Sequence, residues 1–174
     1  MKQLHASLLN ASLALAGWLI CLVTQSTLAV FAAAIIVAIH LYFFGSWKKE
    51  REILAITLIL GSALDSVMSN MGVLHFLGES RILPPWLACV WVMLGITIRH
   101  SLSWAGKNRL AGNLLIVVLA AAHYLALIQF SDISVTMPLW QAIMILSISA
   151  TILINIILTF SAVWLEKYRR QNPE

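Results

Sequence analysis

Charged residues are scarce in this sequence, because Asp, Glu, Lys and Arg together make up 10% of its 174 residues. Hydrophobic residues make up 61%, and this balance excludes an ordinary soluble domain. The net charge of +4 comes from short basic segments between apolar stretches. No folded polar face carries the basic patch that nucleic-acid binding requires. We therefore expect contact with membrane lipids, through their anionic headgroups, and no nucleic-acid partner.

Cysteine is also rare, since Cys21 and Cys89 are the only two. Two cysteines exclude the disulfide framework of a small secreted domain, and the sequence has no Cys/His spacing of the structural-zinc type. Both cysteines lie near the outer ends of their apolar stretches. A disulfide between them is conceivable, but two free buried thiols are the expected state.

Six apolar stretches account for most of the chain. They cover residues 7–23, 28–44, 53–71, 85–104, 110–130 and 139–165. Each approaches or exceeds the roughly 20 residues that cross a hydrocarbon core of about 30 Å. The connectors are too short to form a second folded unit. The sequence therefore predicts an all-α integral membrane protein, a single domain over residues 1–174 that forms a bundle of six transmembrane helices.

Basic residues alternate with these stretches along the chain. Lys2, the segments 48–51 and 107–109, and the segment 167–170 all fall on one side of the predicted bundle, whereas Arg81 is alone on the other side. Cytoplasmic connectors carry an excess of Lys and Arg. We therefore expect both the N-terminus and the C-terminus to lie in the cytoplasm.

Asp65 is the most informative polar residue within the apolar stretches. Other small or polar residues recur with it at three- and four-residue steps on one helical face: Thr57, Gly61, Ser62, Ser66, Ser69 and Asn70. A carboxylate at this depth costs on the order of 3 kcal/mol on insertion scales, so it is expected to face other helices. Two interpretations remain open, a structural hydrogen-bond anchor and a ligand, proton or catalytic group.

Helical rise sorts the polar residues of the six stretches into two layers. The outer layer is expected to hold Asp65, Asn70, Trp86, His123, Tyr124 and Gln141. The inner layer is expected to hold Asn10, His40, Arg99, His100, Asn113 and Asn155. We expect Arg99 to reach water from near the inner boundary, and His40 and His100 to cap the inner interface.

The outer layer is the expected place for chemistry. Asp65 and His123 are the candidate catalytic residues, as acid–base or proton-relay groups. The candidate ligand-binding residues are Asn70, Trp86, Tyr124, Gln141, Asn10, His100 and Arg99. No metal site is expected, because Asp65 and His123 supply two ligands and the sequence indicates no third. The pattern identifies no cofactor.

A set of residues in the first, third and fourth stretches has a distinctive spacing. The set is Asn10, Gly17-Trp18, Glu52, Gly61, Asp65, Gly72, Phe76, Pro84-Pro85-Trp86, Trp91, Thr97, Ser101-Leu102 and Trp104. In this spacing the chain resembles the bacterial membrane family catalogued as domain-of-unknown-function family 2878. Tyr124 also fits, but Ala121-Ala122-His123 replaces an expected Gly-Pro step, so no family role extends to His123. The resemblance implies a bacterial inner-membrane protein, and it carries no assigned activity.

Three functions remain open. The first is an enzymatic or binding site in the outer half of the bundle for a lipid or small apolar molecule. The second is a substrate-binding membrane subunit or small transporter that docks on a partner membrane protein. Its docking face would use the small residues of the first two spans: Ala11, Ala14, Gly17, Ala29 and Ala32–Ala34. The third is a non-catalytic accessory membrane protein, in which the polar groups only hold the helices together.

Overall fold

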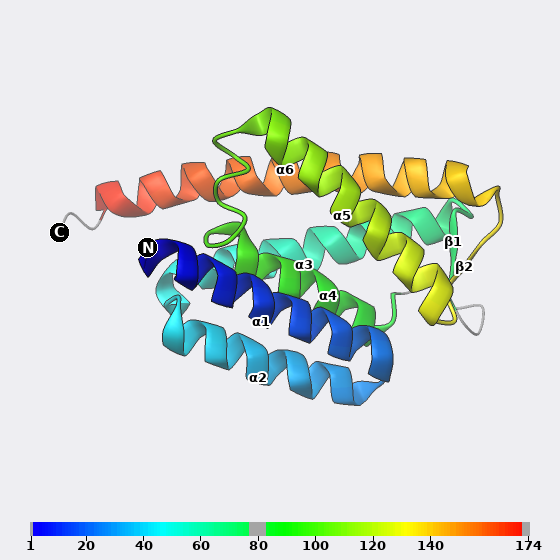
Figure 1. Cartoon of the computed structure of the whole chain (residues 1–174), viewed down its shortest axis with the longest axis horizontal. Coiled ribbons are helices and arrows are strands. Elements are labelled where there is room, and N and C mark those ends of the chain that lie inside the picture. The colour runs from blue at the N-terminus through cyan, green and yellow to red at the C-terminus, as the bar shows by residue number, and fades with distance from the viewer. Residues whose placement is uncertain (1, 77–82, 172–174) are drawn as a thin grey trace.

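The computed structural model describes residues 2–76 and 83–171 of the chain. Its elements are the helices α1 (Lys2–Thr24), α2 (Thr27–Phe43), α3 (Trp47–Asn70), α4 (Pro85–Ile98), α5 (Arg109–Phe130) and α6 (Leu139–Gln171), and the short strands β1 (Leu74–His75) and β2 (Ser134–Val135). The helices run along the long axis of the molecule, with α5 crossing obliquely, and both termini lie at the same end (Figure 1). The predicted all-α architecture is confirmed.

The outer surface of the helices is strongly apolar. Leu8, Phe31 and Val118 are 58%, 69% and 63% exposed, and a continuous surface of this kind is stable only in a nonpolar medium. Four segments are long and apolar enough to cross a membrane: Leu4–Thr24, Trp47–Asn70, Arg109–Phe130 and Leu139–Arg170. The helices α2 and α4 are apolar but shorter, at 17 and 14 residues. The chain is therefore a multi-pass membrane protein.

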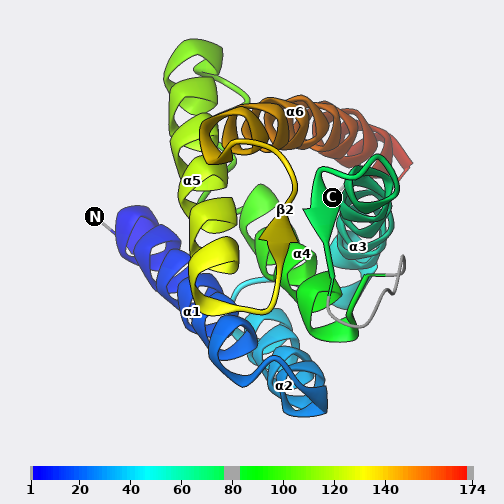
Figure 2. The same cartoon turned by 90° about the vertical axis from the view of Figure 1, so that its right-hand side faces the viewer.

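The central element of the fold is α4. Seen along the long axis, α4 lies in the middle of the molecule with the other helices around it (Figure 2). It packs against α1, α2 and α3, and its Leu87, Met93 and Ile96 side chains are buried. Because protein encloses α4 on most sides, its length need not match the thickness of a hydrocarbon core.

The helix α4 is shorter than the predicted stretch 85–104, because it ends at Ile98 and turns follow it. The backbone N–H groups of His100 and Leu102 both donate to the carbonyl of Thr97, at 3.0 and 2.8 Å. Asn10 of α1 satisfies further polar groups at this helix end. Irregular backbone at membrane depth is tolerated where protein supplies its hydrogen bonds. A side chain about 90 positions away in the sequence thus helps to set the end of α4.

The strands β1 and β2 join two connectors at the end of the molecule opposite the termini (Figure 1). They pair antiparallel, with Leu74 opposite Val135 and His75 opposite Ser134. The hydroxyl of Thr136 also donates to the carbonyl of Gly72. The α3–α4 connector is therefore fastened to the α5–α6 connector. Arg81, predicted to lie alone on this side, falls outside the described residues.

Four of the seven small residues of the expected docking face, Ala14, Gly17, Ala29 and Ala33, pack inside the bundle, whereas Ala11 and Ala34 are exposed. Ala14, Ala29 and Ala33 are 8%, 0% and 4% exposed. A methyl group added at Gly17 would collide with the side chain of Met93 on α4. Close approach of α1, α2 and α4 therefore occupies much of the face that was expected to dock a partner, and the partner itself stays a prediction.

Candidate functional site

Asp65 lies at the centre of the outer polar layer and joins three helices. Its Oδ2 accepts a hydrogen bond from the indole N–H of Trp91 on α4 at 2.6 Å, and its Oδ1 accepts one from the hydroxyl of Tyr124 on α5 at 2.7 Å. All three side chains are buried, and Asp65 is 0% exposed. Its predicted inward orientation is thus confirmed. Because each carboxylate oxygen already has a donor, the geometry favours the hydrogen-bond anchor interpretation of Asp65 over the catalytic one.

Gly61 makes this arrangement possible. It lies one helical turn before Asp65 on α3, and the indole ring of Trp91 occupies the space that a side chain at position 61 would fill. The Trp91 ring can therefore approach α3 closely enough for its N–H to reach the carboxylate. The packing of α3 on α4 and the hydrogen bond to Asp65 depend on each other.

His123 is close to this group but is not hydrogen-bonded to Asp65. Its Nδ1 accepts a hydrogen bond from the indole N–H of Trp18 on α1 at 2.9 Å, so in the neutral ring the proton resides on Nε2. Its ring centroid is 5.0 Å from that of Tyr124. Tyr124 therefore contacts both predicted catalytic residues, which do not form a direct acid–base pair.

The remaining predicted members of the outer layer do not converge on Asp65. Asn70 is exposed and donates to the carbonyl of Ser66 in its own helix at 2.8 Å. Trp86 is buried among apolar side chains in the first turn of α4. Gln141 is half-buried near the start of α6. No hydrogen bond among the described residues joins these three side chains to Asp65.

Asn10 connects three segments of the inner polar layer through its side-chain amide. Its amide nitrogen donates to the carbonyl of Ile96 at 3.1 Å and lies 3.1 Å from Nδ1 of His40. Its amide oxygen accepts from the Ser101 hydroxyl at 2.8 Å and from the Ser101 N–H at 3.3 Å. Asn10 is 0% exposed. It therefore links α1 and α2 to the irregular segment after α4.

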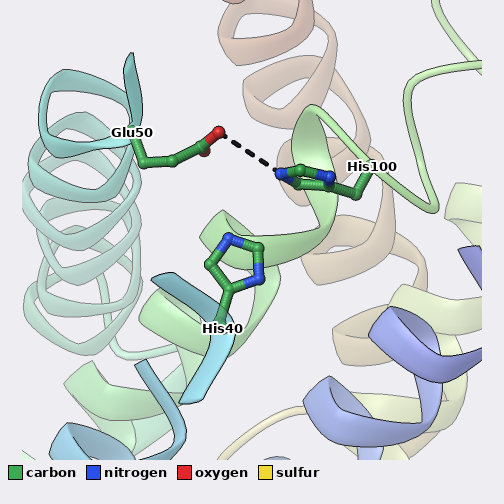
Figure 3. A group of neighbouring side chains, drawn as sticks. All are labelled: His40, Glu50 and His100. Atoms are coloured by element: carbon green, nitrogen blue, oxygen red, sulfur yellow. Dashed lines mark hydrogen bonds and ion pairs between the residues drawn. The ribbon is translucent and has the colours of Figure 1, made fainter. Parts of the chain in front are cut away.

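His40, Glu50 and His100 form a compact cluster (Figure 3), and Asn10 contacts its His40. His40 lies in the last turn of α2, Glu50 in the first turn of α3 and His100 in the turn after α4. Oε1 of Glu50 is 3.3 Å from Nε2 of His100, and the two imidazole centroids are 4.9 Å apart. One ligand atom from each residue lies within 4.8 Å of the other two.

Several polar atoms of the inner layer are buried without a hydrogen-bond partner among the described residues. They include Nε2 of His40, Oε2 of Glu50 and both terminal nitrogens of Arg99. Arg99 turns toward α6, where its Nε donates to the hydroxyl of Ser161 at 3.0 Å and its guanidinium lies 4.7 Å from the Trp164 ring centroid. Buried polar groups are almost always paired, so these unpaired atoms give the inner layer free binding capacity.

Glu50 was missed by the sequence reasoning. It lies within the segment Lys48–Glu52, which has the composition of a solvated connector. In the structure α3 begins at Trp47, and its buried face runs Glu50, Ile53, Leu54, Thr57, Gly61, Asp65 and Met68. Extending the three- and four-residue steps of the Asp65 stripe back toward the N-terminus would have reached Glu50.

An apolar groove lies between α1 and α2 at the end of the molecule that carries the termini. Its volume is about 630 Å³, and it is lined by His5, Ala6, Leu9, Leu13, Ile39, Phe43 and Phe44. The Phe44 ring stacks on the imidazole of His40, with centroids 5.9 Å apart and an interplanar angle of 18°. A single aromatic side chain thus lines the groove and contacts the inner polar cluster.

These features define a multi-pass helical membrane protein with two buried polar layers. One contains the Asp65 carboxylate, which has a donor on each oxygen, and the other contains the unpaired atoms of His40 and Glu50. The family described as "Protein of unknown function (DUF2878)" matches residues 7–156. The chain belongs to this family, as its residue spacing indicated. No curated protein and no solved structure matches the chain.

Proposed function

We propose that the chain forms a single domain that crosses the inner membrane six times, with both termini in the cytoplasm. Support comes from the position of both termini at one end of the molecule (Figure 1). The α2–α3 and α4–α5 connectors also lie at this end. Lys48, Lys49 and Arg51 lie at the start of α3, and Lys107 lies in the α4–α5 connector. On this proposal the shorter α2 and α4 also cross the membrane.

We further propose that the protein binds an anionic phospholipid of the inner leaflet, with one acyl chain in the groove between α1 and α2. The main support for this proposal is the groove itself, because its lining is apolar apart from His5. Its volume of about 630 Å³ lies within the range of small-molecule sites. The groove lies in the inner half of the bundle. The sequence alone had favoured a site in the outer half.

The choice of an anionic lipid follows from charge. An acyl chain gains little by leaving other acyl chains for an apolar protein groove, because both surroundings are nonpolar. Selectivity must therefore come from shape and from the headgroup. Lys48, Lys49 and Arg51 follow Phe44 closely in the sequence, and each basic residue near an anionic headgroup contributes about 1 kcal/mol.

Lipid retention during purification tests this proposal. The full chain would be purified in a mild detergent, and its bound lipids would be identified by native mass spectrometry. Leu9→Trp fills the groove and should lose most of the bound anionic lipid. Leu19→Trp places the same ring on an exposed part of α1 that does not line the groove, and this control should retain the lipid. Equal retention by both variants would refute the groove as the binding site.

A further inference from the structure

We propose that His40, Glu50 and His100 bind one divalent transition-metal ion, zinc or iron(II). Two imidazoles and one carboxylate are a donor set that both ions use in proteins, with further positions left open for water or a substrate. The three residues come from three separate elements and meet at one point (Figure 3). This inference does not depend on lipid binding in the groove.

The spacing of the ligand atoms fits an ion after a small movement. Ligand nitrogen and oxygen atoms at about 2.1 Å from a tetrahedral ion lie about 3.4 Å from each other. Glu50 Oε1 and His100 Nε2 already have this separation, at 3.3 Å. The ligand atoms all lie within 4.8 Å of one another, so His40 needs to approach by about 1.4 Å or less. Side-chain rotation can supply such a shift.

Unpaired atoms give a second and independent indication of a ligand. Nε2 of His40 and Oε2 of Glu50 have no hydrogen-bond partner among the described residues, although these residues are 0% and 4% exposed. Leaving such atoms without a partner inside a protein is costly. An ion between the three side chains would use a lone pair from each ligand, and it would also balance the buried negative charge of Glu50.

Asn10 controls which nitrogen of His40 carries the proton. Its amide nitrogen is identified by its bond to the Ile96 carbonyl, and its oxygen by the bond from the Ser101 N–H. The amide therefore donates to Nδ1 of His40, and without an ion the imidazole proton resides on Nε2. An ion at Nε2 requires the proton on Nδ1, so Asn10 must turn its oxygen toward His40.

The Asn10 amide can rotate in this way because the Ser101 hydroxyl can either donate or accept a hydrogen bond. The Ser101 hydroxyl, which donates to Asn10 at 2.8 Å, can accept from the amide nitrogen instead. The turn sacrifices the bond to the Ile96 carbonyl and the long 3.3 Å bond from the Ser101 N–H. Three metal–ligand bonds outweigh these two hydrogen bonds. Ion binding is consequently coupled to the hydrogen bonds that end α4.

An ion can reach the cluster from the end of the molecule that carries the termini. The side chain of His100 is 22% exposed, whereas that of Glu50 is 5% exposed. Arg99, adjacent in sequence, donates from its Nε to Ser161 and lies over the Trp164 ring, and its positive charge still acts on Glu50. His100 is therefore the expected first contact of an incoming ion, and Glu50 and His40 complete the site.

Metal content of the full chain tests the inference. Tag-free protein in detergent would be stripped with a chelator, incubated with Zn²⁺, Fe²⁺ or Co²⁺, desalted, and analysed by elemental mass spectrometry and by the visible absorption of Co²⁺. Wild type should hold about one ion per chain, and Glu50→Gln and His100→Ala should hold much less. His75→Ala removes an exposed imidazole on β1 and should bind as wild type does. A wild-type chain without bound ion, or equal binding by His100→Ala, would overturn the proposal.

Two variants of Asn10 test the coupling separately from the ligands. Asn10→Ala removes the oxygen that, after the turn, accepts the Nδ1 proton of ion-bound His40, and it should weaken Zn²⁺ binding by about 10- to 100-fold. Asn10→Asp provides an acceptor for the Nδ1 proton and should bind Zn²⁺ at least as tightly as wild type. For each variant that folds, the increase in unfolding temperature on adding Zn²⁺ gives a second measure of the relative Zn²⁺ affinities. Leu9→Trp should retain the ion even when it loses lipid, which separates this proposal from the groove.

Discussion

Glu50 and Asp65 lie on the same buried side of α3, about 22 Å apart along its axis. Asp65 has a donor on each carboxylate oxygen, whereas Oε2 of Glu50 has no hydrogen-bond partner among the described residues. The buried face of this helix thus carries one acid with both oxygens hydrogen-bonded and one acid with an unpaired oxygen. The difference separates a carboxylate that holds helices together from one with capacity to bind.

Substitution of Asp65 distinguishes an anchor from a catalytic group. Asp65→Leu leaves the Trp91 N–H and the Tyr124 O–H unpaired and should lower the free energy of unfolding by about 2 kcal/mol. Asp65→Asn should cost less, because its oxygen still accepts from Trp91 and its amide can donate to the tyrosine oxygen. Thermal unfolding in detergent shows which of the two variants loses more stability. Equal destabilisation by both variants would contradict the hydrogen-bond scheme.

Asn10 offers a matched comparison with another asparagine. Asn10→Ala removes partners from the Ile96 carbonyl and from Ser101, and we expect a loss of about 2 kcal/mol in the free energy of unfolding. Asn70→Ala removes one bond within an exposed part of α3 and should change that free energy by about 0.5 kcal/mol or less. Chemical unfolding of both variants in mixed micelles measures the difference. Similar losses would show that Asn10 is not the link between α1 and α4.

Gly61 should tolerate no side chain. Gly61→Ala forces the Trp91 ring away from α3, and overpacking of this kind costs about 1 to 3 kcal/mol. Gly106→Ala is the control, because the nearest atom to an added methyl group is the Ser103 carbonyl oxygen at 3.8 Å. Tryptophan fluorescence during unfolding reports both stability and the environment of the displaced ring. A neutral Gly61→Ala variant would mean that Trp91 packs elsewhere.

The six-span topology predicts which exposed positions react on each side of the membrane. In a Cys21→Ala, Cys89→Ala background, Asp132→Cys should react with an impermeant maleimide in intact expressing cells. Lys107→Cys should react only after permeabilisation. Both native residues are exposed, so accessibility within the fold is comparable. Labelling of Lys107→Cys in intact cells would refute the proposed orientation.

Much of the helical architecture was readable from the sequence, because helices that face lipid must be apolar over their whole length. The predicted stretch 110–130 differs from α5 by one residue at its start. The inward orientation of Asp65 followed from the cost of exposing a carboxylate to hydrocarbon. Its contact with Tyr124 was anticipated only as membership of one layer, because helical rise gives depth along the axis and not the partner.

Other features depend on contacts that no local pattern encodes. The end of α4 at Ile98 involves Asn10 on another helix. The strands β1 and β2 have two residues each, too few for an alternating pattern to be recognised. Glu50 was overlooked because its basic neighbours have the composition of a connector, although its helical position places it inside. Local composition and tertiary burial disagree at this residue.

The pairing of β1 with β2 has a consequence for how the protein can move. Separation of the α3–α4 pair from the α5–α6 pair must break backbone hydrogen bonds if it starts at the strand end. At the opposite end it meets side-chain contacts such as that of Arg99, just after α4, with Ser161 on α6. The strand pair is therefore expected to act as a hinge, so that the α3–α4 and α5–α6 pairs separate first at the end where the cluster of His40, Glu50 and His100 lies.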